Sequence, residues 1–254
     1  MIKRTLAMAI LVAGVAWRLC GADTGPNLIA AVHPESIRID AAYNGARVTV
    51  TGSIPSEAGA LIRVLGKAES YKLKQKGRVL GLWMNRGSVE ISKVPGLFLL
   101  YRPTGAGDAQ STDPPELGLE SIRQGAEVVA QDQNRKELLD EFFKLKQKAG
   151  LYGTVANAIR YEPATGPLKS FTAVLTLPAA LPQGAFEVEV FAIQNGSVVA
   201  KDVRTIEVNE VGLPAWISTL AFQHGTLYGT LAVLVAIMAG WLTGTLFKAG
   251  KGAH

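Results

Sequence analysis

The feature that most constrains this chain is a segment near its C-terminus without any charged side chain, Leu227 to Phe247. An α-helix rises about 1.5 Å per residue, so this segment would be roughly 31 Å long, the thickness of the hydrocarbon core of a bilayer. The segment therefore predicts a transmembrane helix at residues 227–247. Lys248 and Lys251 follow it without an acidic residue, so the positive-inside rule predicts a cytoplasmic tail at residues 248–254.

The N-terminus has the pattern of an export signal. Lys3 and Arg4 precede the apolar run from Leu6 to Trp17, which is too short to span a bilayer. Cys20-Gly21-Ala22 offers small residues at the −3 and −1 positions of a cleavage site, which predicts a signal peptide at residues 1–22. A lipoprotein signal at Cys20 is a weaker alternative, because a small residue should precede that cysteine. Both ends of the chain thus predict a periplasmic domain at residues 23–212, anchored in a bacterial inner membrane.

The cysteine count and the charge balance exclude several classes of function. Cys20 is the only cysteine, so a chain cleaved after Ala22 has no disulfide, thiolate nucleophile or cysteine-bound metal. The leader and the tail together carry five cations and no acid, and these account for the whole net charge of +5. The ectodomain is therefore neutral, and the basic pI is a targeting signal that does not indicate nucleic-acid binding.

Alternating apolar and polar residues predict many short strands. Val48 and Val50 alternate with threonines, Val89 and Ile91 alternate with polar residues, and Phe186 to Val190 repeats the pattern late in the chain. Short strands spaced by roughly ten residues are typical of a β-sandwich, and an immunoglobulin-like one is expected. The predicted fold class is mainly β.

A helical insertion is predicted at about residues 105–155. Asp113-Pro114-Pro115-Glu116 has the pattern of a helix start, and that helix should end at Gly125. A second helix is predicted at residues 132–149, with Gly150 at its C-terminal boundary. Because its apolar stripe must be buried, we expect the insertion to pack on the sandwich.

Two predictions concern the membrane itself. The apolar segment at residues 213–226 is expected to lie in the headgroup layer, with Trp216 and Phe222 at that level. Small residues recur every fourth position along one face of the predicted transmembrane helix, which favours close packing with itself or with another membrane protein. These residues are Ala232, Ala236, Gly240 and Gly244.

No residue pattern indicates catalysis. The three histidines, His33, His224 and His254, are too dispersed for a metal site, and we predict neither a metal nor a cofactor. Glu137, Asp140 and Glu141 have the spacing of a solvated helix face. We therefore expect the protein not to be an enzyme, with a hydrolase as the less favoured alternative.

The segment from Tyr71 to Asn85 is the candidate contact site. Lys72, Lys74, Lys76 and Arg78 stand at every second position, so in a strand they share one face. Such a row either prevents an edge strand from pairing with other chains or binds an anion, a lipid headgroup or an acidic partner. The following residues 79–85, with Trp83, are expected to lie in the core.

Several short motifs together resemble a family of putative transmembrane proteins first grouped in alphaproteobacteria. They are the run from Gly77 to Asn85, Val94-Pro95, Gly150-Leu151-Tyr152, Leu177-Pro178, Pro182-Gln183-Gly184, Leu227-Tyr228-Gly229 and Gly240-Trp241. The resemblance covers nearly the whole mature chain. It implies a periplasmic protein anchored in the inner membrane, accessory to a permease that exports anions of the sulfite type.

The expected function is therefore a non-enzymatic, membrane-anchored periplasmic interaction module. Its expected partners are membrane lipid and either another inner-membrane protein or a second copy of the chain, bound through the transmembrane helix. An anion- or lipid-headgroup-binding or sensing domain is the alternative.

Overall fold

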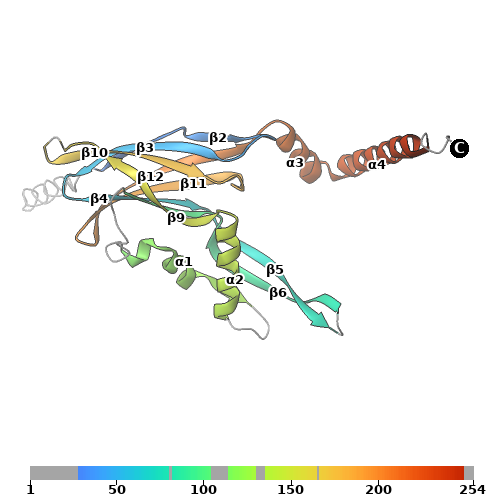
Figure 1. Ribbon diagram of the computed structural model, residues 1–254, viewed down its shortest axis with the longest axis horizontal. Helices are drawn as coiled ribbons and strands as arrows, with labels where there is room; N and C mark the ends of the chain where they lie inside the picture. Colours follow the sequence, from blue (N-terminus) through green and yellow to red (C-terminus); the bar gives the residue numbers. More distant parts are fainter. Residues whose placement is uncertain (1–27, 80–81, 104–113, 130–134, 165, 249–254) are drawn as a thin grey trace, which may run out of the picture.

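The computed structural model describes residues 28–79, 82–103, 114–129, 135–164 and 166–248. Figure 1 shows a curled β-sheet, a long hairpin with helices beside it, and a helical arm that carries the C-terminus. Strands predominate over helices, so the predicted mainly-β class is confirmed.

One sheet contains nine strands in the order β1-β3-β10-β9-β7-β4-β11-β12-β2. Two residues separate β1 from β2, yet β1 pairs with β3 at one edge and β2 pairs with β12 at the other. The sheet must therefore curl to bring its two edges together. The immunoglobulin-like detail stays a prediction. The strands are β1 (Ile29–His33), β2 (Ser36–Ile39), β3 (Ala46–Pro55), β4 (Gly59–Gly66), β7 (Phe98–Pro103), β9 (Tyr152–Tyr161), β10 (Leu168–Leu177), β11 (Gly184–Gln194) and β12 (Ser197–Glu210).

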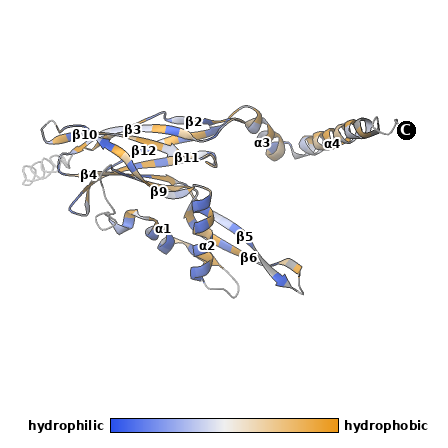
Figure 2. Cartoon of the chain, in the orientation of Figure 1, coloured by the Kyte–Doolittle hydropathy of each residue, from blue (hydrophilic) through white to orange (hydrophobic). Residues whose placement is uncertain are grey.

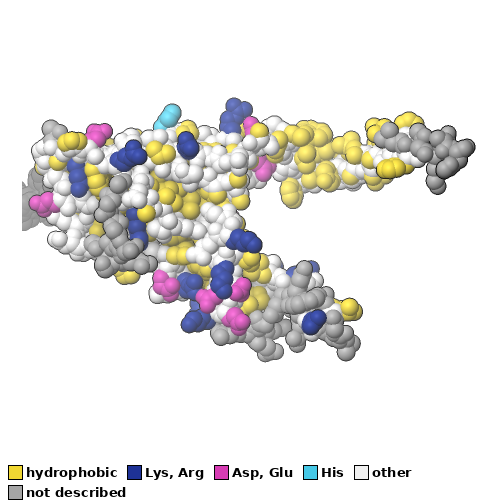
Figure 3. Space-filling model, viewed as in Figure 1, with side chains coloured by type: hydrophobic (Ala, Val, Ile, Leu, Met, Phe, Trp, Pro, Cys, Tyr) yellow, Lys and Arg dark blue, Asp and Glu magenta, His cyan; other side chains and the backbone are white. Residues whose placement is uncertain are grey.

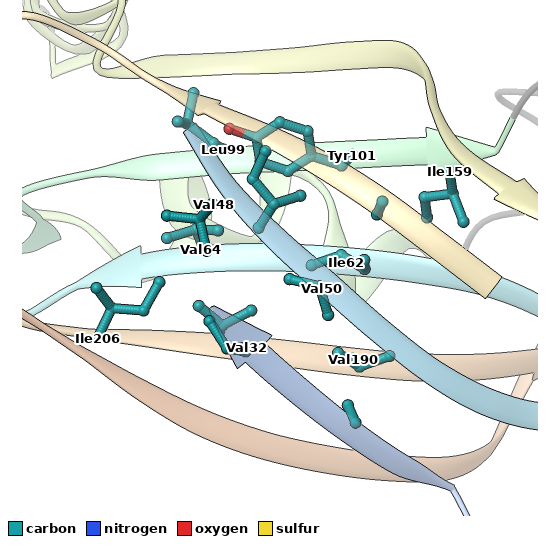
Figure 4. Close-up of a cluster of buried hydrophobic side chains, with 14 of the residues drawn as sticks. Val32, Val48, Val50, Ile62, Val64, Leu99, Tyr101, Ile159, Val190 and Ile206 are labelled. Carbon is teal, nitrogen blue, oxygen red and sulfur yellow. The ribbon is translucent and has the colours of Figure 1, made fainter. Parts of the chain in front are cut away.

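The main core lies inside this curl. Alternate residues of each strand point inward, including Val48, Val50, Ile62 and Val64, all of which are fully buried (Figure 4). Tyr101 is buried among them, and its hydroxyl donates a hydrogen bond to the Thr176 carbonyl oxygen at 2.8 Å. The alternation read from the sequence thus predicts the inner face of the sheet correctly.

A second, three-stranded sheet has the order β5-β6-β8, with β5 (Ala68–Val79), β6 (Leu82–Pro95) and β8 (Glu127–Val129). Only Lys67 separates β4 from β5, so the hairpin of β5 and β6 continues directly out of the large sheet. The short β8 covers part of the outer edge of β6, whereas β5 is an edge strand.

Between β7 and β9 lie a 3-10 turn, η1 (Pro115–Leu117), and two helices, α1 (Leu119–Gly125) and α2 (Arg135–Lys148). The first helix differs from the prediction, because Gly118 is extended and divides it into a 3-10 turn and a short α-helix. Asp113, its predicted cap, lies outside the described residues. The second helix is confirmed where it is described, and Gly150 follows it with φ +71°.

The helices pack on the outer face of the large sheet. Phe142 and Phe143 of α2 are buried against Tyr152 of the sheet, with ring centroids 6.3 and 5.4 Å from its ring. Phe98 belongs to the same buried cluster. The same cluster includes the base of the hairpin at Ile91 and Val94. Figure 2 shows hydrophilic residues on α2 where it faces away from the sheet. The segment is therefore an insertion packed on the sheet, as expected.

The chain ends in two helices, α3 (Leu213–Gln223) and α4 (Gly225–Lys248). Within the described residues, α4 is the one helix long and apolar enough to cross a membrane, and its apolar window Gly225–Thr245 is fully exposed. The predicted interfacial segment is helical in α3, where Trp216 and Phe222 are exposed. Its location in a headgroup layer stays a prediction, and the predicted signal peptide lies outside the described residues.

Candidate functional site

The hairpin of β5 and β6 has two unlike faces. Near its base, Tyr71 and Leu73 of β5 pair with Ile91 and Val89 of β6, and all four contact the core beneath α2. Successive side chains of a strand point to opposite faces, so Lys72 and Lys74 lie on the other face from Tyr71 and Leu73 and are exposed. Lys74 also lines a groove beside α2. Packing of the other face on α2 thus leaves Lys72 and Lys74 accessible to solvent.

The structure places the predicted cations along one edge strand. Lys72, Lys74 and Arg78 are exposed, and Lys76 also belongs to β5, although its side chain is outside the described part. Within the residues that the structure describes, no ion pair involves Lys72, Lys74 or Arg78. Both sequence-based alternatives, edge protection and binding of an anionic surface, are compatible with this placement.

A buried lysine joins α2 to the base of the hairpin. The Lys146 ammonium donates hydrogen bonds to the Tyr71 hydroxyl at 2.7 Å and to the Gly96 carbonyl oxygen at 3.5 Å. The Tyr71 hydroxyl in turn donates to the Glu69 carboxylate. Burial lowers the pKa of Lys146, and the nearby Glu69 charge opposes this effect only in part. Burial and the Glu69 contact raise the pKa of Tyr71.

Sequence reasoning missed this lysine. A signal was present, because Lys146 follows Leu139, Phe142 and Phe143 at three- and four-residue spacing and therefore lies on the apolar stripe of α2. A lysine on such a stripe needs a polar partner within the core. That partner, Tyr71, comes from a strand 75 positions earlier, so the helix pattern alone could not identify it.

The far part of the hairpin contradicts one prediction. Leu82 and Met84 were expected in the core with the rest of residues 79–85, but they are 68% and 52% exposed. The physical reason is that α2 covers only the base of the hairpin, and beyond it the apolar face has no neighbouring element among the described residues. The Trp83 side chain lies outside the described part.

A groove of about 330 Å³ runs between α2 and the hairpin. Its walls are mainly apolar and include Leu73, Val89, Leu138 and Leu145. Apolar surface is therefore exposed both beside α2 and near the end of the hairpin.

The remaining candidates do not converge on a reactive centre. Glu141 pairs with Lys144 on the surface of α2 at 2.9 Å, whereas Asp140 pairs with Arg123 of α1. His33 lies in β1 and His224 between α3 and α4, whereas His254 is outside the described residues. No group of three potential metal ligands occurs in the part of the chain that the structure describes.

The small residues Ala232, Ala236, Gly240 and Gly244 all lie exposed on α4. A Cβ atom added at Gly240 or Gly244 would meet no described atom within 4 Å. Their spacing of four residues places them along one side of the helix, so the predicted helix packing stays open.

Comparison with known proteins gives one match. A family model described as "Putative transmembrane protein (Alph_Pro_TM)" matches residues 27–249, which include both sheets, the insertion and α4. Comparisons with curated proteins and with solved structures found no match.

Proposed function

Because the chain belongs to the Alph_Pro_TM family of putative transmembrane proteins and has one C-terminal helix able to span the membrane, we propose that it is a membrane-anchored interaction module. In this proposal the β domain lies in the periplasm and α4 crosses the inner membrane. The module binds a second protein of the same membrane and carries out no reaction of its own. An anion exporter is the partner class that we favour.

The observation that supports this function most strongly is the exposed row of cations on β5. Lys72, Lys74 and Arg78 lie on a strand whose other face is buried near its base, so they are held at a defined distance from the core. In an ectodomain without net charge, three exposed cations on one strand form a distinct positive region. Such a region suits the acidic surface of a protein partner.

Several buried or perturbed polar groups have partners within the fold. Hydrogen bonds from Arg63 and Lys201 hold the pKa of Glu189 below its ordinary value, although burial alone would raise it. Lys146 is bound to Tyr71, and the Tyr152 hydroxyl donates to the Pro95 carbonyl oxygen at 2.6 Å. Each of these groups has a contact within the fold that accounts for its environment, and they lie at separate places in it.

Charge reversal on β5 tests this function. We expect that replacing Lys72, Lys74 and Arg78 together by glutamate removes the partner, because an acidic surface would then meet three like charges. The measurement is photo-crosslinking in intact membranes with a crosslinker at residue 88, which pairs with Lys74 across the hairpin. A discrete adduct with the unaltered chain should be lost in the triple variant.

The matched control reverses three exposed cations elsewhere, Arg47, Lys148 and Arg160. This control changes the net charge by the same amount and should keep the adduct. Recovery of a lone monomer from mild detergent under all conditions, without any adduct, would contradict the proposed function.

A second candidate function is the binding of a small anion by the same cations. The absence of ion pairs to Lys72, Lys74 and Arg78 among the described residues favours it. In that case sulfite, sulfate or phosphate should raise the melting temperature, because a ligand that binds only the folded state stabilises it. The triple glutamate variant should lose this increase. No change in melting temperature with any of the three anions would exclude this candidate.

A further inference from the structure

The hairpin and the membrane-spanning helix leave the large sheet at the same end. β4 and β12 both run antiparallel to β11, so β4 and β12 run in the same direction. β12 leads into α3 and α4, and β4 leads into β5 after one residue. Figures 1 and 3 show the result: the hairpin and the helical arm project as two separate extensions toward the C-terminal end of the molecule.

The hairpin is long enough to reach the level at which α4 begins. The twelve residues of β5 span about 40 Å at roughly 3.3 Å per residue. The eleven residues of α3 span only about 16 Å at roughly 1.5 Å per residue before α4 begins. Although the hairpin is inclined to the long axis of the molecule, Figure 1 shows that it extends along that axis as far as the start of α4.

The apolar face of the hairpin continues beyond the helix that covers its base. Val89 and Ile91 lie beneath α2 and are 4% and 0% exposed, whereas Met84 and Leu82 farther along β6 are largely exposed. All four share one face, because a bulge between the pairs Gln75–Gly87 and Lys76–Asn85 shifts the alternation of β6 by one residue. An apolar sheet face thus ends without a covering element among the described residues, at the level where α4 begins.

The charges beside this face suit a lipid surface. Leu82 and Met84 lie on one face of the hairpin. The cations Lys72, Lys74 and Arg78 lie on its opposite face. Basic residues are attracted to anionic headgroups, and apolar side chains add to this attraction when they enter the headgroup–acyl boundary. The hairpin has apolar side chains near its end and cations along β5. This combination suits the boundary between headgroups and acyl chains.

We propose that the β5–β6 hairpin is a second membrane attachment, in which Leu82 and Met84 enter the boundary of the bilayer that α4 spans. Lys72, Lys74 and Arg78 then lie close to anionic headgroups. Two attachments at one end of the sheet give the domain a defined orientation over the bilayer. Attachment through α4 alone would let the domain tilt. This inference needs no protein partner and therefore goes beyond the proposed function.

Depth-dependent fluorescence quenching tests the attachment. The full chain with Cys20→Ser and Leu82→Cys carries a polarity-sensitive fluorophore at residue 82 and is reconstituted into vesicles of phosphatidylcholine and phosphatidylglycerol. We expect a blue-shifted emission that lipids brominated near the headgroup quench. The same label at Met84→Cys should behave alike, which guards against local misfolding of one variant.

The control is Ser197→Cys, at the opposite end of the large sheet where β12 begins. Its label should keep the emission expected in water and show no quenching by brominated lipid. Water-like emission at both residues 82 and 84 would overturn the attachment. A blue shift without quenching would also overturn it, since it would mean that a second protein copy covers this face.

Lipid composition tests the electrostatic part. Omitting phosphatidylglycerol, or replacing Lys72, Lys74 and Arg78 by glutamate, should reduce the blue shift at residue 82. An unchanged shift under both conditions would overturn the contact with anionic headgroups. Since purified protein and lipid are the only components, these outcomes do not depend on whether a protein partner exists.

Discussion

Replacing Glu189 by glutamine is expected to lower the free energy of unfolding by about 3 kcal/mol, the low end of the range for breaking a buried ion pair. Its carboxylate accepts hydrogen bonds from the Arg63 guanidinium at 2.6 Å and the Lys201 ammonium at 2.7 Å. Arg63 is only 13% exposed and would keep a positive charge without its counter-charge, whereas Lys201 is 45% exposed and can be solvated instead. Urea denaturation of the full chain in detergent, followed by tryptophan fluorescence, measures the change.

Glu187→Gln is the matched control. Glu187 lies two residues earlier on the same face of β11 but is exposed, so its replacement should change the free energy of unfolding by less than about 0.5 kcal/mol. Equal effects of the two substitutions would show that the buried ion pair contributes nothing specific.

The same carboxylate should make the protein sensitive to acid. Because its pKa in the folded state lies below the ordinary value of 4.5, the pair stabilises the fold fully above that pH. The contribution is lost as the pH falls through the folded-state value. The difference in stability between the unaltered chain and Glu189→Gln should therefore shrink progressively below about pH 4.5.

Phe143→Ala should have the other large effect. Phe143 is fully buried between the helical insertion and the sheet, where its ring is 5.4 Å from that of Tyr152 and 4.9 Å from the Arg123 guanidinium carbon. Truncating a core phenylalanine leaves a cavity and costs about 3–5 kcal/mol. Thermal denaturation measures the loss. Hydrogen exchange should also increase at the base of the hairpin, because α2 holds that base through the same cluster.

Leu145→Ala on the same helix is the control for this second prediction. Leu145 is exposed, so its truncation should leave the melting temperature and the hydrogen exchange nearly unchanged. Phe143→Ala could lower the stability without increasing hydrogen exchange in β5 and β6. That result would show that α2 does not position the hairpin.

Much of the fold could be predicted from residues that are close in sequence. Val48 and Val50 alternate with threonine and are buried in the curled sheet, as a period of two requires. Gly150 ends α2 because the chain there has φ +71°, which glycine adopts without strain. The uncharged segment near the C-terminus is a fully exposed helix long enough to span a bilayer. Each of these features depends on local geometry.

Only the part of the candidate site that depends on local geometry could be predicted. Lys72, Lys74 and Arg78 are exposed on an edge strand, where simple alternation places them. Leu82 and Met84 were assigned to the core because apolar residues usually lie there. Whether an apolar face is covered depends on how far α2 extends along the hairpin, and this is a long-range property of packing.

Local sequence patterns thus predict the membrane-spanning helix, the alternation of the strands and the row of cations, since each depends on neighbouring residues. Which side of the hairpin is covered, and toward which end it projects, becomes visible only in the folded chain. A bulge in β6 shifts the alternation by one residue, and pairing through β11 sets the direction of both extensions. Both depend on pairing between strands distant in sequence, which no local pattern encodes.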